Sequence, residues 1–168
     1  NAEKAAFAQK TDLRSLDEVI EDADLFLGLS GPNVLETSMI KKMRAKPIIF
    51  ALANPSPEVM PENARKAAAD AIIATGRSDF PNQVNNVLCF PFIFRGALDV
   101  EATEINDEMQ LACIDAIAEI AKTTTSAEAA AAYQGEALTF GPEYLIPKPF
   151  DPRLSVVVSS AVAQAAMQ

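Results

Sequence analysis

The sequence predicts an α/β fold, in which a partial parallel sheet is flanked by helices and followed by a helical C-terminal segment. Three short, nearly continuous apolar runs, 24–30, 46–53 and 70–76, have the character of strands that are buried on both faces. A stretch with helical spacing or helix-start signals precedes each run. Strands that alternate with single helices pair in parallel through right-handed crossovers.

Local signals support the three helices that precede these strands. In the first, 13–23, Ser15 is followed by Glu18 in the pattern of a capping box. The second, 34–43, ends in a cationic turn that suits the negative end of a helix dipole. A proline opens the third, 61–69, where its missing N–H costs nothing.

After residue 81 the pattern becomes mostly helical. Residues 87–98 are apolar and aromatic, and their proline and glycine leave an extended segment and a buried helix both open. Residues 106–122 have the apolar stripe of an amphipathic helix. The remaining expectations are a helix over the Ala-rich 127–132, an irregular segment over 144–152, and a last helix over 155–167 that can also start as a strand at 156–158.

Composition narrows the function classes. The chain has 168 residues, 49% hydrophobic and 22% charged, enough for one domain or a large piece of one. Its net charge of −9 suits a nucleic acid poorly, so we expect no such partner. The absence of histidine excludes a Ser-His-Asp triad, a Cys–His pair and His-ligated zinc within this chain. No apolar run approaches a membrane span, so we expect no membrane association.

The cysteines and the first residues suggest the context of the chain. Cys89 and Cys113 are too few for a disulfide framework and lie in apolar stretches, so we expect reduced core thiols in a cytoplasmic protein. The sequence starts at Asn1 with neither an initiator Met nor a signal-peptide pattern. We therefore expect it to be cut from a longer chain.

Small and amide-bearing residues follow the predicted strands. Ligands of open parallel sheets bind at the carboxyl ends of the strands. Amides donate and accept hydrogen bonds, which suits a carboxamide, a ribose or a hydroxy acid. The polar candidates at these ends are Ser30, Asn54, Ser78, Asn82, Asn85 and Asn86.

Structural roles remain open for several of these residues. Asn54 precedes a proline, which is common turn chemistry. Asn85 and Asn86 can instead cap a helix. Arg77 can bind an anion, although a surface ion pair with Asp79 or Glu58 competes with that role.

One expected motif of a dinucleotide-binding domain is missing. Such a domain seats the pyrophosphate on a G-x-G-x-x-G turn, and residues 28–31 (GLSG) do not have that pattern. If the fold is Rossmann-like, only its second half is present.

Longer strings then resemble one enzyme family. Residues 51–55 (ALANP), 74–79 (ATGRSD) and 81–96 (PNQVNNVLCFPFIFRG) resemble malic enzyme, most closely the bacterial type with a phosphotransacetylase-like C-terminal domain. Residues 140–154 (FGPEYLIPKPFDPRL) resemble the same enzymes near the end of their malic region. The resemblance extends over essentially the whole chain.

This resemblance implies oxidative decarboxylation of malate to pyruvate and carbon dioxide with NAD or NADP and a Mg or Mn ion. It assigns Asn54 to the nicotinamide end of the cofactor and to the substrate, and Asn85 and Asn86 to malate. Ser30 and Gly31, at the end of the first strand, are our further cofactor-binding candidates. The family's acid–base residues, metal ligands and glycine-rich loop belong before residue 1, so we expect no catalytic residue and no metal ligand here and an isolated chain that is inactive.

The resemblance also implies a domain organisation. It makes residues 1–168 the carboxyl-terminal part of an NAD(P)-binding domain, with βα units over 1–80 and a mostly helical closing segment over 81–168. The implied partners are malate or pyruvate, the rest of the polypeptide and further copies in a homo-oligomer. Two alternatives stay open: a fragment of another Rossmann-type dehydrogenase, and a non-catalytic interaction or assembly module.

Overall fold

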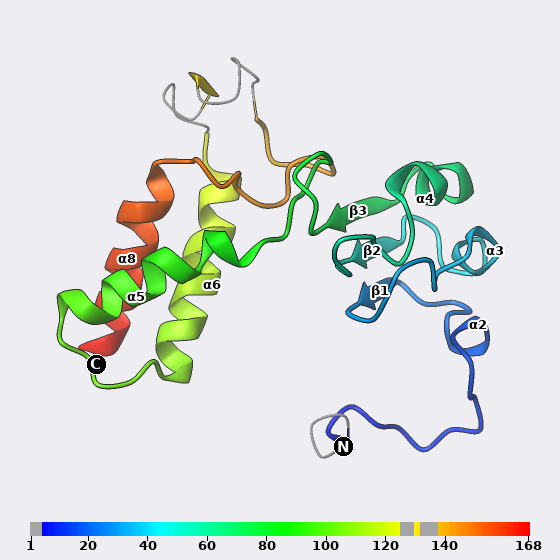
Figure 1. The fold of residues 1–168 in the computed structure, drawn as a ribbon, viewed down its shortest axis with the longest axis horizontal. Coiled ribbons are helices and arrows are strands. Elements are labelled where there is room, and N and C mark those ends of the chain that lie inside the picture. Colours follow the sequence, from blue (N-terminus) through cyan, green and yellow to red (C-terminus); the bar gives the residue numbers. More distant parts are fainter. Residues whose placement is uncertain (1–4, 125–129, 132–137) are drawn as a thin grey trace.

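The computed structural model describes residues 5–124, 130–131 and 138–168. A small sheet with short helices forms one part of the molecule and three longer helices form the other (Figure 1). Each part has its own cluster of buried apolar side chains, around Ile49 and Ile73 in the first and around Leu154 and Val158 in the second. The predicted boundary at residue 80, between the βα units and the helical closing segment, stays a prediction, and the presence of two separate clusters supports it.

The three predicted strands form one parallel sheet, as expected from their apolar runs. They are β1 (Leu25–Gly28), β2 (Ile48–Ala51) and β3 (Ile72–Thr75), in the order β1-β2-β3. The register pairs Gly28 with Ala51 and Ala51 with Thr75, so the strands end level with one another. Every strand lies inside its predicted run, and the prediction of an α/β fold is confirmed.

The helices beside the sheet are shorter than the sequence predicts. They are α2 (Leu16–Val19), α3 (Thr37–Ile40) and α4 (Pro61–Ala67). The capping box of α2 is present, since the Glu18 carboxylate accepts the backbone N–H of Ser15 at 2.8 Å. Asp22 has a φ of 58° and Asn33 has a φ of 58°, left-handed conformations that interrupt a helix. The first helix stops before Asp22, and the second, which follows Asn33, both starts later and ends earlier than predicted.

Residues 87–98, left open by the sequence, are mostly helical. A 3-10 turn, η1 (Asn86–Leu88), leads into α5 (Phe90–Asp99). The proline of this stretch lies in the first turn of α5, where no N–H is needed. Its glycine lets α5 approach α8 closely, because a Cβ on Gly96 would lie 2.5 Å from the carbonyl oxygen of Ser159.

The two remaining long helices follow the predictions closely. They are α6 (Asp107–Lys122) and α8 (Arg153–Ala166), and residues 156–158 are helical. Residues 144–152 contain neither a helix nor a strand, as expected. The Ala-rich helix expected over 127–132 falls mostly outside the described residues.

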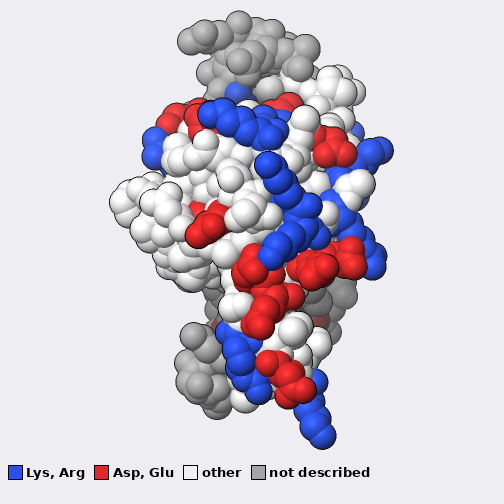
Figure 2. Space-filling model, turned by 90° about the vertical axis from the view of Figure 1, so that its right-hand side faces the viewer, with Lys and Arg blue, Asp and Glu red and all other residues white. Residues whose placement is uncertain are grey.

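The surface beside the short helices carries both signs of charge. Figure 2 shows Lys and Arg side chains next to Asp and Glu side chains on this face. Lys42 forms an ion pair with Asp17, and Arg44 forms one with Asp24. Both pairs are substantially exposed, so each contributes little to stability. Among the described residues, no helix has the length and apolarity needed to cross a bilayer.

Candidate functional site

The level ends of the strands bring three segments to one edge of the sheet. Ser30 and Gly31 follow β1, and Asn54 follows β2. After β3 the chain forms a loop and then runs parallel to the end of the strand, since Thr75 forms a parallel bridge with Gln83 and the Val84 N–H donates to the Thr75 carbonyl at 2.8 Å. This turn starts the segment that leads to Asn85 and Asn86 from the same edge.

The amides predicted to bind ligands differ in how far they are exposed to solvent. Asn54 and Asn86 are exposed and Asn85 is half-buried. The Asn85 Oδ1 atom accepts the Val87 N–H at 3.0 Å, so part of Asn85 caps the 3-10 turn, which is the structural role left open above. Within the described part of the chain, Asn54 and Asn86 make no side-chain hydrogen bond, and neither does the Asn85 Nδ2 group.

Ser30 and Gly31 lie on an open loop. A Cβ on Gly31 would have nothing within 4 Å, so this backbone is accessible to a ligand. The Ser30 N–H donates at 2.9 Å to Oε1 of Glu58 and is therefore used inside the protein. Hydroxyl, backbone and amide groups of this kind fit the ribose and carboxamide of a nicotinamide cofactor.

Glu58 does not lie where the sequence predicts it. Its side chain is fully buried, so it is not the surface partner of Arg77 considered above. The carboxylate sits between the ends of β1 and β2 and accepts the Ala53 N–H at 3.0 Å as well as the Ser30 N–H. No signal in the sequence marks this role, because an acidic residue is usually solvated.

Arg77 makes a surface ion pair, as the alternative reading predicted. Its Nε lies 2.8 Å from Oδ1 of Asp79, and its guanidinium lies over the Phe80 ring. The hydrogen bond from Arg77 lowers the pKa of the Asp79 carboxyl below its ordinary value. A role of Arg77 in anion binding gains no support from this geometry.

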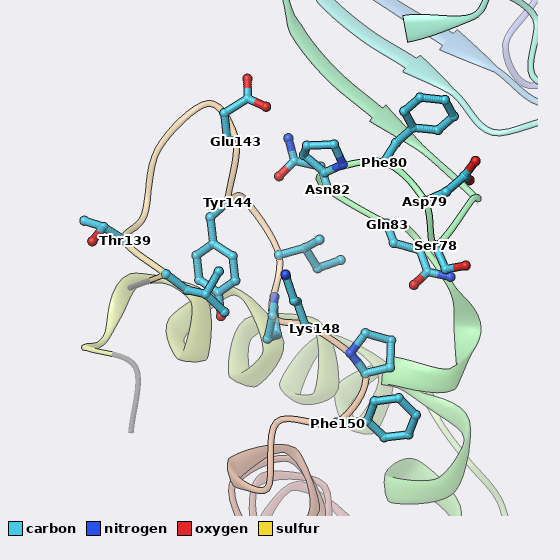
Figure 3. A pocket seen from close by; sticks show the side chains of 15 residues that line it. Ser78, Asp79, Phe80, Asn82, Gln83, Thr139, Glu143, Tyr144, Lys148 and Phe150 are labelled. Carbon is cyan, nitrogen blue, oxygen red and sulfur yellow. The ribbon is translucent and has the colours of Figure 1, made fainter. Parts of the chain in front are cut away.

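A separate cleft lies between the turn after β3 and the chain before α8 (Figure 3). Ser78, Asn82 and Gln83 line one side, and Tyr144 and Lys148 line the other. The Asn82 amide is engaged with backbone groups, at 2.9 Å from the Ile73 carbonyl and 2.7 Å from the Pro142 carbonyl. Asn54, Asn85 and Asn86 do not line this cleft, so it is distinct from the edge that carries the candidate amides.

Both cysteines are unoxidised thiols of the helical part. Their sulfur atoms are 3.4 Å apart, Cys113 is buried and Cys89 is half-buried. Burial, together with the hydrogen bond to Cys89, raises the pKa of the Cys113 thiol to about 12. The structure is consistent with the expected core thiols.

The donor set does not fit a metal ion. Over residues 5–124, 130–131 and 138–168 there is no cluster of three or more His, Cys, Asp or Glu side chains that could hold one. The expectation that the metal ligands lie outside this chain stays a prediction.

Comparison with known proteins identifies the family. The family model described as "Malic enzyme, NAD binding domain" matches residues 1–133. The chain belongs to this family. The resemblance seen in the strings around Asn54 and Asn86 is thereby confirmed.

Curated malic enzymes match nearly the whole chain. The "NADP-dependent malic enzyme" of Escherichia coli (strain K12) is 63% identical over 166 residues, which cover 98% of this chain and 22% of that protein. The "NAD-dependent malic enzyme" of Rhizobium meliloti (strain 1021) is 58% identical over 165 residues, covering 98% and 21%. This member of the malic enzyme family thus spans about a fifth of the length of these relatives.

Solved malic enzymes share the fold. The NAD-dependent malic enzyme of Thermotoga maritima has a TM-score of 0.79 and 42% identity, and the match covers 96% of this chain and 38% of that one. The malic enzyme of Entamoeba histolytica has a TM-score of 0.81 and 37% identity, covering 99% and 32%.

Proposed function

We propose that this chain positions cofactor and substrate in an NAD(P)-dependent malic enzyme, which converts malate to pyruvate and carbon dioxide. The observation that carries the proposal is the shared edge of the sheet. Three strands end in register, and the segments that follow them carry the exposed amides of Asn54 and Asn86 and the half-buried amide of Asn85. The names of the relatives above supply the reaction class.

Asn54 has the central role in this proposal. Its carboxamide both donates and accepts, so it can orient the nicotinamide carboxamide and the hydroxyl-bearing carbon of malate together. Bound there, the cofactor would supply the hydride acceptor for that carbon. Ser30 and Gly31 would contact the cofactor from the neighbouring loop, where the backbone is open.

Asn85 and Asn86 would bind malate itself. Amide N–H groups stabilise carboxylates through charge-assisted hydrogen bonds. Asn85 can keep its Oδ1 on the Val87 N–H and still offer Nδ2 to the substrate, so capping and binding are compatible. We assign no acid–base catalyst to this chain, and the proposed Mg or Mn would be held by residues outside it.

The proposed partners follow from the same assignment. They are malate or pyruvate, the rest of the malic enzyme polypeptide and further copies of that polypeptide in a homo-oligomer, in the cytoplasm. The chain covers 22% of the E. coli relative. We therefore propose that the acid–base residues and metal ligands belong to other parts of the longer polypeptide.

The test compares the isolated chain with the longer polypeptide that contains it. Reduction of NAD and of NADP is followed with malate and Mg or Mn. We expect the longer polypeptide to reduce one cofactor and the isolated chain to reduce neither. Turnover by the purified isolated chain, or failure of the longer polypeptide to use malate with either cofactor, would contradict the proposal. Capture of a protein partner without any effect of nucleotide would instead favour the assembly-module alternative.

A further inference from the structure

Glu58 occupies an unusual position between two strand ends. It lies in the segment that joins β2 to α4, and its side chain has an exposed fraction of 0%. Its Oε1 atom accepts the Ser30 N–H at 2.9 Å, and its Oε2 atom accepts the Ala53 N–H at 3.0 Å. The two donors are the residues directly before Gly31 and Asn54, so one carboxylate holds the start of both candidate loops.

The main chain around Glu58 strengthens the same connection. The Glu58 carbonyl accepts the Leu35 N–H at 3.0 Å, and the Pro57 carbonyl accepts the Asn33 N–H at 3.1 Å. The loop after β1 is therefore joined to the segment after β2 along several residues. The ends of the strands themselves are joined by the Leu52 N–H, which donates to the Gly28 carbonyl at 3.1 Å, and the Glu58 carboxylate extends this connection to Ser30 and Ala53, beyond the last paired residues.

A buried carboxylate is costly unless hydrogen bonds replace its hydration. Among the described residues Glu58 has no ion-pair partner, and its carboxylate is met by the two N–H groups and by the Ser30 hydroxyl, which donates to Oε1 at 3.4 Å. Hydrogen bonds to an ionised acceptor are shorter and stronger than neutral ones, and two of them on one planar group fix both distance and direction. An apolar residue of similar volume would fill the space without fixing either.

Gly28 leaves the room that this carboxylate needs. A Cβ on Gly28 would lie 2.7 Å from both Oε1 and Oε2 of Glu58, which is closer than nonbonded atoms can pack. Gly28 is the last residue of β1, and the strand can pass over the carboxylate only without a side chain there. The two residues therefore form one packing unit.

We propose that Glu58 is a positioning residue that sets the separation of the Ser30–Gly31 loop from Asn54, and thereby the geometry of the cofactor's nicotinamide end. This inference rests on the proposed function, because it assumes that these two loops bind the cofactor. Glu58 acts through the Ser30 and Ala53 backbone and does not itself touch a ligand.

The experiment uses the longer polypeptide with four variants: Glu58→Gln, Glu58→Ala, Gly28→Ala and the double variant Gly28→Ala with Glu58→Ala. The amide of Glu58→Gln keeps the shape but turns an NH2 group toward one backbone N–H. We expect it to raise the KM for the cofactor about ten-fold. Gly28→Ala displaces the carboxylate and should raise the same KM. Glu58→Ala should also raise this KM. In the double variant the Cβ on residue 28 has no carboxylate to displace, so the KM should rise no further than in Glu58→Ala alone.

Val59→Ala is the matched control. Val59 is the next residue, is buried, and packs in the core cluster of the sheet without bonding to either loop. It should lower the melting temperature and leave the cofactor KM unchanged. A Glu58→Gln enzyme that melts lower but has the wild-type cofactor KM would overturn the proposal and leave Glu58 a purely structural residue.

A second measurement does not depend on the variants folding. In the wild-type polypeptide the Ser30 and Ala53 amide protons should exchange slowly with solvent, although Ser30 itself is exposed. If these two amide protons exchange as fast as those of an open loop, their hydrogen bonds to the Glu58 carboxylate do not persist in solution, and the proposal is wrong. Failure of the wild-type polypeptide to oxidise malate would instead count against the proposed function, since this exchange measurement is independent of activity.

Discussion

Asn82, in the turn after β3, is hydrogen-bonded to Leu145, in the chain before α8: its Oδ1 atom accepts the Leu145 N–H at 2.8 Å. Its Nδ2 group donates to the carbonyls of Ile73, in β3, and Pro142. Asn82 is buried, and its φ of 55° is one that asparagine adopts more easily than most residues. One side chain thus connects the sheet to the chain that leads into α8.

We expect Asn82→Ala to destabilise the fold strongly. The change leaves the Leu145 N–H and the two carbonyls without this partner, at about 1–3 kcal/mol for each buried group that stays unsatisfied. Denaturant unfolding of both proteins gives the difference in the free energy of unfolding. Asn82→Gly is the control for backbone strain, because glycine adopts the positive φ freely and also lacks the side-chain hydrogen bonds. If Asn82→Gly unfolds like wild type, the bonds contribute nothing and this view of Asn82 is wrong.

Gly96→Ala should separate α5 from α8. The added Cβ would lie 2.5 Å from the Ser159 carbonyl oxygen and 2.8 Å from the Val162 Cβ, so the helices must move apart. Overpacking of this kind costs about 1–3 kcal/mol. The expected result is a lower melting temperature, measured by circular dichroism.

Gly31→Ala is the matched control for that change. A Cβ there meets nothing within 4 Å, so the melting temperature should stay close to wild type. Equal losses in the two variants would show that backbone effects, and not helix contact, explain the result at Gly96.

The Cys113 thiol should be inert in the native protein. Its pKa is raised to about 12, so at neutral pH it carries its proton, and the thiolate is the form that reacts with iodoacetamide. Mass spectrometry should find Cys113 alkylated only after denaturation. Rapid labelling of Cys113 in the folded protein would contradict its burial.

The same raised pKa predicts a loss of stability in alkali. The unfolded thiol ionises near its ordinary pKa of 9.0, whereas the folded one keeps its proton to about 12. The native state therefore binds more protons between these values, and the free energy of unfolding should fall as pH rises through this window. Cys113→Ala removes this contribution, and an unchanged pH slope in that variant would contradict the assignment.

The isolated chain should self-associate through the edge formed by β1. This strand is at the end of the sheet, and Leu25 and Leu27 are 52% and 54% exposed. Unpaired strand edges with apolar side chains are prone to pairing with another chain. Sedimentation should show concentration-dependent association that Leu27→Lys weakens. Leu111→Lys, at an exposed position of α6, is the control, and an equal effect of both would exclude the β1 edge as the site.

The sheet was predictable because its signals are local. The runs that contain Ile49 and Ile73 are apolar on both faces, and alternation with helices leaves parallel pairing as the natural topology. The first short helix was overestimated, because the left-handed Asp22, which lies inside the predicted range 13–23, does not show in apolar spacing.

The site was only partly predictable. Asn54, Asn85 and Asn86 stood out because strand ends and amide pairs are visible in a sequence. Glu58 did not, because its role depends on a carboxylate reaching backbone groups 28 and 5 residues away. An acidic residue is usually solvated, and nothing short of the folded geometry shows that this one is buried.

The proposal that Asn54, Asn85 and Asn86 position malate and cofactor is tested most directly by alanine variants of the longer polypeptide, with steady-state kinetics and thermal melts measured together. A hydrogen bond to a charged group contributes roughly 1.5–3 kcal/mol, so kcat/KM for malate should fall about ten- to a hundred-fold or more in Asn85→Ala and Asn86→Ala. Asn54→Ala should weaken both cofactor binding and turnover. Lower melting temperatures with wild-type kinetic constants in all three variants would contradict the account and return these asparagines to turns and caps.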